Sequence, residues 1–193
     1  MPSLNFSRRT ATDGPWRIAV AIAVALLCCL PASLVAQQTA DESQLKAAFL
    51  FNFGKFVEWP EAAASAKEPL TICVAGDNGV AHSLSELTAG KAVNGKEVKV
   101  VLLHSLESNG NCQILFIGRS ASKDKKTLLE RVQNAPILTV GEEGNFTEQG
   151  GILTFLKEGS RIHFAVNQEA AARSGLKISS KLLALAQIVH SKE

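Results

Sequence analysis

The sequence contains no apolar run long enough to cross a membrane. Its longest such run, residues 18–30, has 13 residues, whereas a membrane-spanning helix needs about 20. Three arginines precede the run, and a proline with several small residues separates it from the polar Gln37. This order is typical of a cleavable secretory signal. We therefore expect residues 1–36 to be removed on export and the remaining chain to act outside the cytoplasm.

Common catalytic and metal-binding motifs are also absent from the sequence. It has no Gly-x-Ser-x-Gly elbow, which excludes the commonest α/β hydrolase arrangement. Its four histidines occur singly, and no His-x-x-x-His or Cys-x-x-Cys spacing indicates a metal site. Neither the Gly-x-Gly-x-x-Gly motif nor the phosphate-binding loop motif occurs. The sequence therefore predicts a protein that acts by binding, without a catalytic site, metal or cofactor.

Two glycine-bounded turns carry polar groups that could form a site. Glu142 and Glu143 stand between glycines, which indicates a solvated turn rather than a pair of catalytic carboxylates. Gly76, Asp77 and Asn78 follow an expected strand and precede an expected helix. Backbone amides at the start of such a helix could hold a small anion. We favour a plain tight turn, with ligand binding by these three residues as the alternative.

The charge of the chain gives no indication of a nucleic-acid partner. Residues 1–36 contain three of the 20 basic residues and one of the 18 acidic residues, so 17 of each sign remain after cleavage. Lys123, Lys125 and Lys126 form a short basic cluster, but no aromatic residue lies between them as it would in a nucleic-acid-binding surface. We expect these lysines to form the solvated start of a helix.

Removal of the leader changes the cysteine count. Cys28 and Cys29 leave with it, and Cys73 and Cys112 remain. An even pair in an oxidising compartment predicts a disulfide, with two separately buried thiols as the alternative. The bond would close a 40-residue loop and stabilise the fold by up to about 4 kcal/mol in the chain-entropy model. Cys73 falls late in its expected strand and Cys112 just before its own, so parallel neighbours would need offset registers.

The spacing of apolar residues predicts an alternating order of strands and helices over residues 37–193. Strands are expected at 69–75, 97–103, 113–117, 136–140, 152–156 and 161–167, and helices at 41–58, 80–87, 122–134, 168–174 and 179–190. This order favours a single α/β domain with a largely parallel mixed sheet of about six strands, helices on both faces and an antiparallel hairpin at one edge. Ligands of such sheets bind outside the carboxyl ends of the strands, which is where residues 76–79 would lie.

Six segments of the sequence, in order, resemble the YfiR-like family of periplasmic proteins. They are LKAAFLFNFGKFVEWP at 45–60, TICVAGD at 71–77, CQILFI at 112–117, GGILTF at 150–155, IHFAVN at 162–167 and AARSGLKISSKLLALA at 171–186. Together they extend through nearly all of residues 45–190. Several long motifs in the same order identify a family more specifically than any one of them does.

The resemblance implies a non-enzymatic regulator. Such a protein would bind and repress the periplasmic domain of an inner-membrane diguanylate cyclase, which controls cyclic di-GMP and biofilm formation, and an outer-membrane lipoprotein could sequester it. Cys73 and Cys112 match one of the two disulfides of the family, whereas the second has no counterpart because no cysteine follows Cys112. Some family members serve other membrane sensors. The alternative is therefore a periplasmic small-molecule-binding protein that acts through a membrane sensor kinase.

We expect the contact surface for the membrane partner after the fourth strand. Phe146 lies in a glycine-rich loop, where a large apolar side chain must either fold back or meet a partner. Ile152, Arg173 and Ile178 complete the expected partner-binding residues, with ordinary core packing as the alternative for the two isoleucines. A homodimer remains open, and no nucleic acid is expected as a partner.

Overall fold

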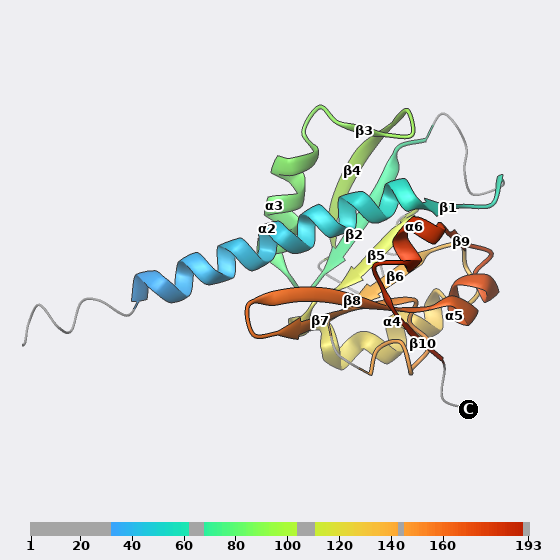
Figure 1. Ribbon diagram of the computed structural model, residues 1–193. Helices are drawn as coiled ribbons and strands as arrows, with labels where there is room; N and C mark the ends of the chain where they lie inside the picture. Colours follow the sequence, from blue (N-terminus) through green and yellow to red (C-terminus); the bar gives the residue numbers. More distant parts are fainter. Residues whose placement is uncertain (1–31, 62–67, 104–110, 143–144, 191–193) are drawn as a thin grey trace, which may run out of the picture. The chain divides into compact units, whose positions relative to one another are not determined.

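The computed structural model describes residues 32–61, 68–103, 111–142 and 145–190. The chain divides into two compact units, Met1–Thr39 and Ala40–Glu193. Of the first unit, only the opening turns of helix α2 (Ala32–Phe56) are described, so the expected signal peptide lies mostly outside the described residues. Among the residues that are described, no helix is long and apolar enough to span a membrane. The second unit contains all the described strands and the remaining described helices (Figure 1).

Within the second unit, α2 packs on the sheet through one face. Ala47, Leu50 and Phe53 lie three residues apart on that face and are fully buried. This is the periodicity of an amphipathic helix. The helix ends before the Trp-Pro pair, because the residue before a proline disfavours helical geometry, and the chain continues as strand β1 (Val57–Glu58). The helix expected at 41–58 is therefore confirmed, although it starts earlier and ends slightly earlier than expected.

One mixed sheet of eight strands forms the centre of the second unit. The strand order is β10-β8-β7-β6-β5-β2-β4-β3, and five of the seven neighbouring pairs are parallel. The strands are β2 (Leu70–Ala75), β3 (Ala92–Val93), β4 (Lys96–Leu103), β5 (Ile114–Ile117), β6 (Leu138–Gly141), β7 (Leu153–Glu158), β8 (Arg161–Asn167) and β10 (Gln187–Val189). A separate two-stranded sheet joins β1 to β9 (Lys177–Ile178). The α/β class with a largely parallel sheet is confirmed, with eight strands among the described residues rather than about six.

Helices cover both faces of the sheet, as expected. They are, besides α2, α3 (Asn78–Thr88), the 3-10 helix η2 (Arg119–Asp124), α4 (Lys125–Arg131), α5 (Gln168–Arg173) and α6 (Ser180–Leu183). Alternate residues of a strand point to opposite faces. In β2, Ile72 and Val74 pack with α2 and α3, whereas Cys73 and Ala75 pack with α4. Figure 1 shows α2 across one face and α4 on the other. The helix expected at 122–134 divides into η2 and α4.

The carboxyl-terminal segment differs from the expectation. The expected helix at 179–190 is wrong, because α6 ends after four residues and the chain then runs as strand β10. β10 lies parallel to β8, with Gln187 opposite Ala165 and Val189 opposite Asn167. The apolar residues of this segment also fit helical spacing, but the edge of β8 supplies hydrogen-bond partners to the backbone of β10 instead. Strands β1, β3 and β9 have two residues each, which is too short to produce a periodic signal.

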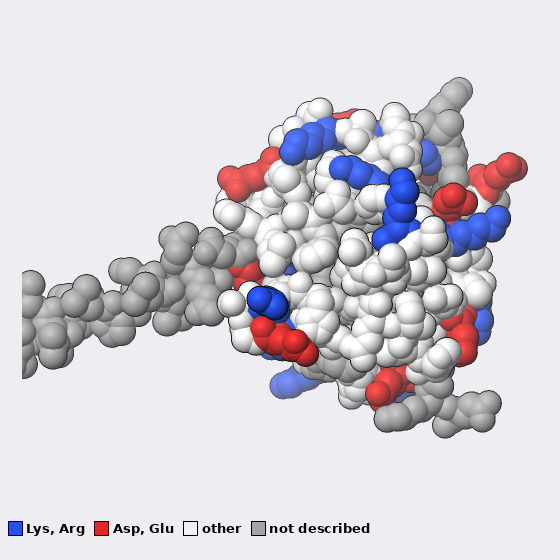
Figure 2. Space-filling view, viewed as in Figure 1, with Lys and Arg blue, Asp and Glu red and all other residues white. Residues whose placement is uncertain are grey.

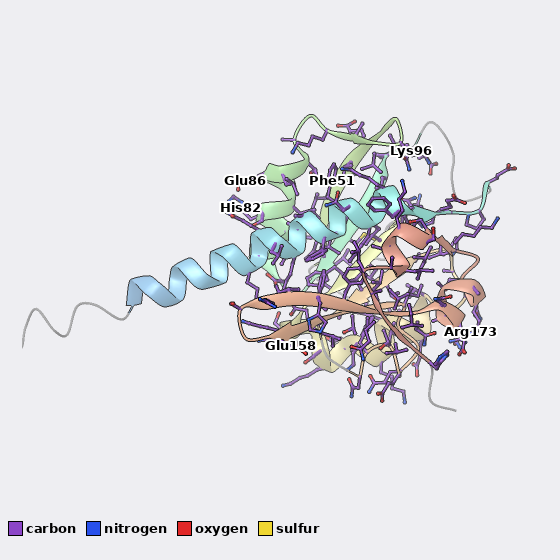
Figure 3. The ribbon with its side chains drawn as sticks, in the orientation of Figure 1. Phe51, His82, Glu86, Lys96, Glu158 and Arg173 are labelled. Atoms are coloured by element: carbon purple, nitrogen blue, oxygen red, sulfur yellow. A yellow bond between two sulfur atoms is a disulfide. The ribbon has the colours of Figure 1, made fainter. Side chains whose placement is uncertain are left out.

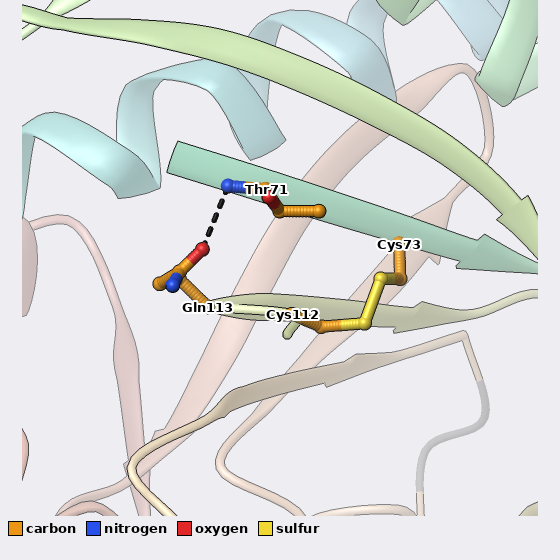
Figure 4. Close-up of a disulfide and its surroundings, with 4 residues drawn as sticks. All are labelled: Thr71, Cys73, Cys112 and Gln113. Atoms are coloured by element: carbon orange, nitrogen blue, oxygen red, sulfur yellow. Dashed lines mark hydrogen bonds between the residues drawn. A yellow bond between two sulfur atoms is a disulfide. The ribbon is translucent and has the colours of Figure 1, made fainter. Parts of the chain in front are cut away.

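A disulfide joins two neighbouring strands of the sheet. Cys73 in β2 and Cys112 just before β5 are bonded, with their Cα atoms 5.8 Å apart (Figure 4). The predicted bond is therefore confirmed. In the register of β2 and β5, Cys73 lies opposite Leu115. Cys112 is therefore not opposite Cys73, and it bonds to Cys73 from a position before β5 begins. Gln113 holds this offset, because its backbone N–H donates to Thr71 O at 2.9 Å and its Oε1 accepts from Thr71 N–H at 2.7 Å.

Candidate functional site

Two interlocked loops close the carboxyl ends of the central parallel strands. The loop after β2 begins with Gly76, whose carbonyl accepts a hydrogen bond from Ser120 Oγ at 2.5 Å. A side chain at Gly76 would overlap the backbone of Ala121, and one at Gly118 would lie 2.7 Å from Asp77 Cβ. The two loops therefore pack so closely that only glycine fits at the contact.

The residues expected to bind a ligand at these strand ends have structural contacts of their own. Asp77 is the N-cap of α3, and its Oδ1 accepts a hydrogen bond from Val80 N–H at 2.9 Å. Asn78 begins α3 and is exposed. Gly76 has a φ of +71°, a conformation that residues with a side chain rarely adopt. Two surface cavities, of about 600 and 240 Å³, are lined by other residues. Ligand binding by this loop stays a prediction.

A partly buried ion cluster lies beside these loops. Lys46 of α2 is only 7 % exposed and forms ion pairs with Glu42, at 2.6 Å, and with Glu142. Lys157 near the end of β7 contacts the other carboxylate oxygen of Glu42 at 2.6 Å. Glu142 follows β6 and also accepts a hydrogen bond from the backbone N–H of Arg119 at 2.8 Å. The cluster thus connects α2 to the carboxyl ends of β5, β6 and β7.

The cluster changes the ionisation of two of its members. Hydrogen bonds from Lys157 and Lys46 lower the pKa of Glu42 from 4.5 to about 2. Burial alone would lower the pKa of Lys46, but its interactions with Glu142 and Glu42 outweigh burial and raise this pKa above its ordinary value. Both groups are therefore charged at neutral pH. The expectation of a solvated turn is wrong for Glu142, whose side chain is 4 % exposed, and Glu143 lies outside the described residues.

Phe146 folds into the core rather than outward toward a partner. None of its surface is exposed, and its ring lies so close to the backbone of Gly141 and Gly151 that a Cβ on either glycine would overlap it. The expected exposure of Phe146 is therefore wrong. The two glycines leave room for the ring, and neither is adjacent to Phe146 in the sequence.

The other three residues expected to meet a partner divide between core and surface. Ile152 is 2 % exposed, and its backbone N–H donates to Thr139 Oγ1 at 3.0 Å. Ile178 is half-buried and pairs with Val57 in the β1–β9 sheet. Arg173 is exposed at the end of α5 (Figure 3). Of the four expected residues, Arg173 is the one whose side chain is exposed.

Two large apolar side chains are exposed beside the carboxyl-terminal strand. Leu185 is 74 % exposed and Ile188 is 41 % exposed. β10 is an outer strand, so one of its edges has no strand neighbour among the described residues. Figure 2 shows charged side chains mainly around the margin of this face and an uncharged area over β10 and the neighbouring part of β8. We call Leu185, Ile188 and the outer edge of β10 the β10 patch.

Sequence analysis missed the β10 patch because it assigned the whole segment to a helix. The available signal was the β-branched pair Ile188 and Val189, which favours a strand over a helix. A two-residue signal is weak when the preceding leucines fit helical spacing.

Two contacts bring the start of α5 next to β10. Val189 lies opposite Asn167, the N-cap of α5, and His190 Nδ1 lies 3.1 Å from Glu169 Oε1. Arg173 follows about one turn further along α5. These contacts place the end of β10 beside the start of α5.

The described histidines each have an acidic neighbour. His82 lies 3.5 Å from Glu86 on α3, with both side chains exposed (Figure 3), and His163 lies 3.9 Å from Glu158. Within the part of the chain that the structure describes, no group of three His, Cys, Asp or Glu side chains could hold a metal ion.

Comparison with known proteins relates most of the chain to one family. The family model described as YfiR/HmsC-like matches residues 43–187. Two solved structures also match: a conserved domain protein from Vibrio cholerae, with 15 % identity over 63 % of this chain and a TM-score of 0.44, and the ABC domain in complex with L-Trp from Streptococcus pneumoniae, with 12 % identity over 62 % of this chain and a TM-score of 0.47. The chain spans 54 % and 56 % of their respective lengths.

Proposed function

Because this chain belongs to the YfiR/HmsC-like family of regulatory proteins, we propose that it is an exported, non-enzymatic regulator of a membrane signalling protein. It binds the periplasmic domain of an inner-membrane diguanylate cyclase and represses that enzyme. Repression limits cyclic di-GMP and therefore biofilm formation, and an outer-membrane lipoprotein that sequesters the regulator relieves it. The observation that carries this proposal is the family match over residues 43–187.

The contact with the cyclase lies on the β10 patch and the exposed end of α5. A leucine that is 74 % exposed leaves apolar surface in water, and binding energy at interfaces concentrates in a few such side chains once they are desolvated. The outer edge of β10 presents backbone N–H and C=O groups that an extended segment of a partner can pair with. Arg173 adds a positive charge at the rim, and arginine is enriched in protein interfaces.

A deletion strain tests both the function and the surface. Deletion should raise cyclic di-GMP, and the wild-type gene should restore the low level. The double variant Leu185→Ser/Ile188→Ser should fold but fail to restore it. Leu45→Ser is a matched control, because Leu45 is 40 % exposed on α2 and Ile188 is 41 % exposed. This control should repress as the wild type does.

The possible failures of this experiment have different meanings. Unchanged cyclic di-GMP in the deletion strain would overturn the cyclase as partner and favour a sensor kinase instead. Normal repression by Leu185→Ser/Ile188→Ser would discard the β10 patch as the contact surface and leave the function intact.

Export is proposed separately from partner binding. We propose that cleavage after residue 36 produces a mature amino terminus at Gln37. The intact mass of protein isolated from the periplasm should equal that of residues 37–193. A chain that retains Met1 and sediments with membranes would contradict this proposal.

A further inference from the structure

A cavity of about 600 Å³ lies between α4 and α5. Its volume is within the range of roughly 300–1,000 Å³ that is typical of small-molecule sites. Residues of η2 and α4 form one wall, and Arg173 with Ser174 at the end of α5 forms the opposite wall. Gln149 and Gly150, in the loop before β7, form a third side. Three separate segments of the chain therefore enclose this groove.

The floor of the groove is largely apolar. Val132, Ile152 and Ala170 line it, and each is less than one-tenth exposed. Thr139 also lies there, but its Oγ1 already accepts the hydrogen bond from Ile152 N–H. A ligand that reaches the floor therefore gains free energy by burying an apolar group.

The walls of the groove carry an excess of positive charge. Lys123, Lys125 and Lys126 line one wall and Arg173 the other, and Glu130 is the acidic residue of the lining. Lys126 and Glu130 approach to 3.9 Å, but both side chains are exposed, so solvent weakens their attraction. The groove therefore attracts small anions.

Lys125 is the most deeply buried of these cations. It is 9 % exposed, and its Nζ donates a hydrogen bond to Asn145 Oδ1 at 3.2 Å. The lysine cluster, expected from the sequence to be a solvated helix start, therefore has one member built into the wall of a cavity.

We propose that the groove between α4 and α5 binds a small organic anion. Its apolar part lies on Ile152 and Ala170, and its carboxylate or phosphate faces Lys123, Lys126 and Arg173. Arg173 lines the groove and is also part of the proposed partner contact. An anion in the groove therefore changes the charge of the surface beside the proposed partner contact, which makes it a regulator of that contact.

Titration with 8-anilinonaphthalene-1-sulfonate tests the site directly, because this apolar organic anion fluoresces strongly in apolar surroundings. The purified protein should bind it saturably. The variant Lys123→Glu/Lys126→Glu should weaken binding by about tenfold or more, since two attractions become repulsions. The control Lys91→Glu/Lys99→Glu also reverses two exposed lysines, but both lie outside the groove. It should bind the probe as the wild type does.

Two further measurements separate this site from other anion and dye binding. An equimolar amount of inorganic phosphate should leave the probe bound, because phosphate has no apolar part, and displacement by phosphate would overturn the proposal. Leu185→Ser/Ile188→Ser should bind the probe normally, and loss of binding in this variant would locate the probe on the β10 patch instead. If Lys123→Glu/Lys126→Glu binds the probe as tightly as Lys91→Glu/Lys99→Glu does, the groove is not the binding site and the proposal is overturned. None of these readouts depends on repression of a cyclase.

Discussion

Two regions of the second unit differ in which groups they bury: the carboxyl ends of the central strands and the β10 side. At the strand ends, Lys46 and Glu142 are buried as an ion pair and glycine loops pack against each other. On the β10 side, Leu185 is largely exposed and a strand edge has no described neighbour. The usual ligand-binding region of an α/β sheet therefore joins α2 to the sheet in this chain, while the large exposed apolar side chains of Leu185 and Ile188 lie on the β10 side.

Removing the cation of the closed region should have the largest effect on stability. Lys46→Met keeps the length of the side chain but leaves Glu142, whose side chain is 4 % exposed, without its counter-ion. Breaking a buried ion pair from one side costs about 3–5 kcal/mol, which lowers the melting temperature by about 10 °C in a domain of this size. Thermal unfolding followed by circular dichroism measures it.

A double variant is the control for this effect. Lys46→Met/Glu142→Gln removes both charges, so it should melt well above Lys46→Met, since replacing both partners of a buried pair is often nearly neutral. If Lys46→Met unfolds within a degree or two of the wild type, the cluster does not hold the strand ends closed.

Loss of the disulfide should have the next largest effect. Cys112→Ser opens the covalent link between β2 and β5, the strands that carry the two interlocked loops. The expected loss is about 2–4 kcal/mol, or a melting temperature lower by several degrees. Reduced wild-type protein should melt like the variant, and Cys73→Ser/Cys112→Ser should not respond to reductant. A wild-type melting curve that reduction leaves unchanged would contradict a stabilising role.

Acid should weaken the closed region through Glu42. The pKa of Glu42 is about 2 in the folded chain against an ordinary value of 4.5. A carboxylate with a lowered pKa stabilises the fold above its unfolded value, and this stability is lost as the pH falls from 4.5 toward 2. The difference in melting temperature between wild type and Glu42→Gln should therefore shrink between about pH 7 and about pH 2.5. A constant difference would show that Glu42 is not responsible.

Polar substitution in the β10 patch should have the smallest effect on stability. Leu185→Ser/Ile188→Ser removes little buried surface, so its free energy of unfolding should stay within about 0.5–1 kcal/mol of the wild type. This result, combined with lost repression in the complementation assay, would sharpen the contrast with Lys46→Met. A large loss of stability would instead show that these side chains pack against the fold.

Local patterns in the sequence predicted much of the fold. The continuous apolar run of β2 and the turn between β7 and β8 both predicted elements that the structure confirms. The Cys73–Cys112 bond followed from cysteine counting and the expected compartment. Each of these features can be read from the sequence without knowing the tertiary structure. A strand buried on both faces is a continuous apolar run, and a turn has characteristic residues. The disulfide was predicted from an even number of cysteines.

The candidate surfaces depended on contacts between distant residues, which local patterns do not contain. Lys46 meets Glu142 only because α2 crosses the ends of β5 and β6. The segment 187–189 becomes a strand only because the edge of β8 is available to it. Phe146 is buried because backbone on both sides of its ring lacks side chains. In each case the residue's environment depends on a contact with a segment that is distant in the sequence or that tertiary structure brings close, which neighbouring residues do not reveal.

The packing of Phe146 against Gly141 and Gly151 also constrains how this protein can vary during evolution. A Cβ at either glycine would occupy space that the ring fills, so a glycine and the aromatic residue cannot change independently. Lack of space, rather than backbone conformation, prevents a larger residue at position 151. Gly151 is not one of the described glycines with a positive φ, whereas Gly150 has a φ of +95°. Relatives with a smaller residue in place of Phe146 are therefore the ones in which alanine can replace Gly151. An alignment of such relatives should show the two positions covarying.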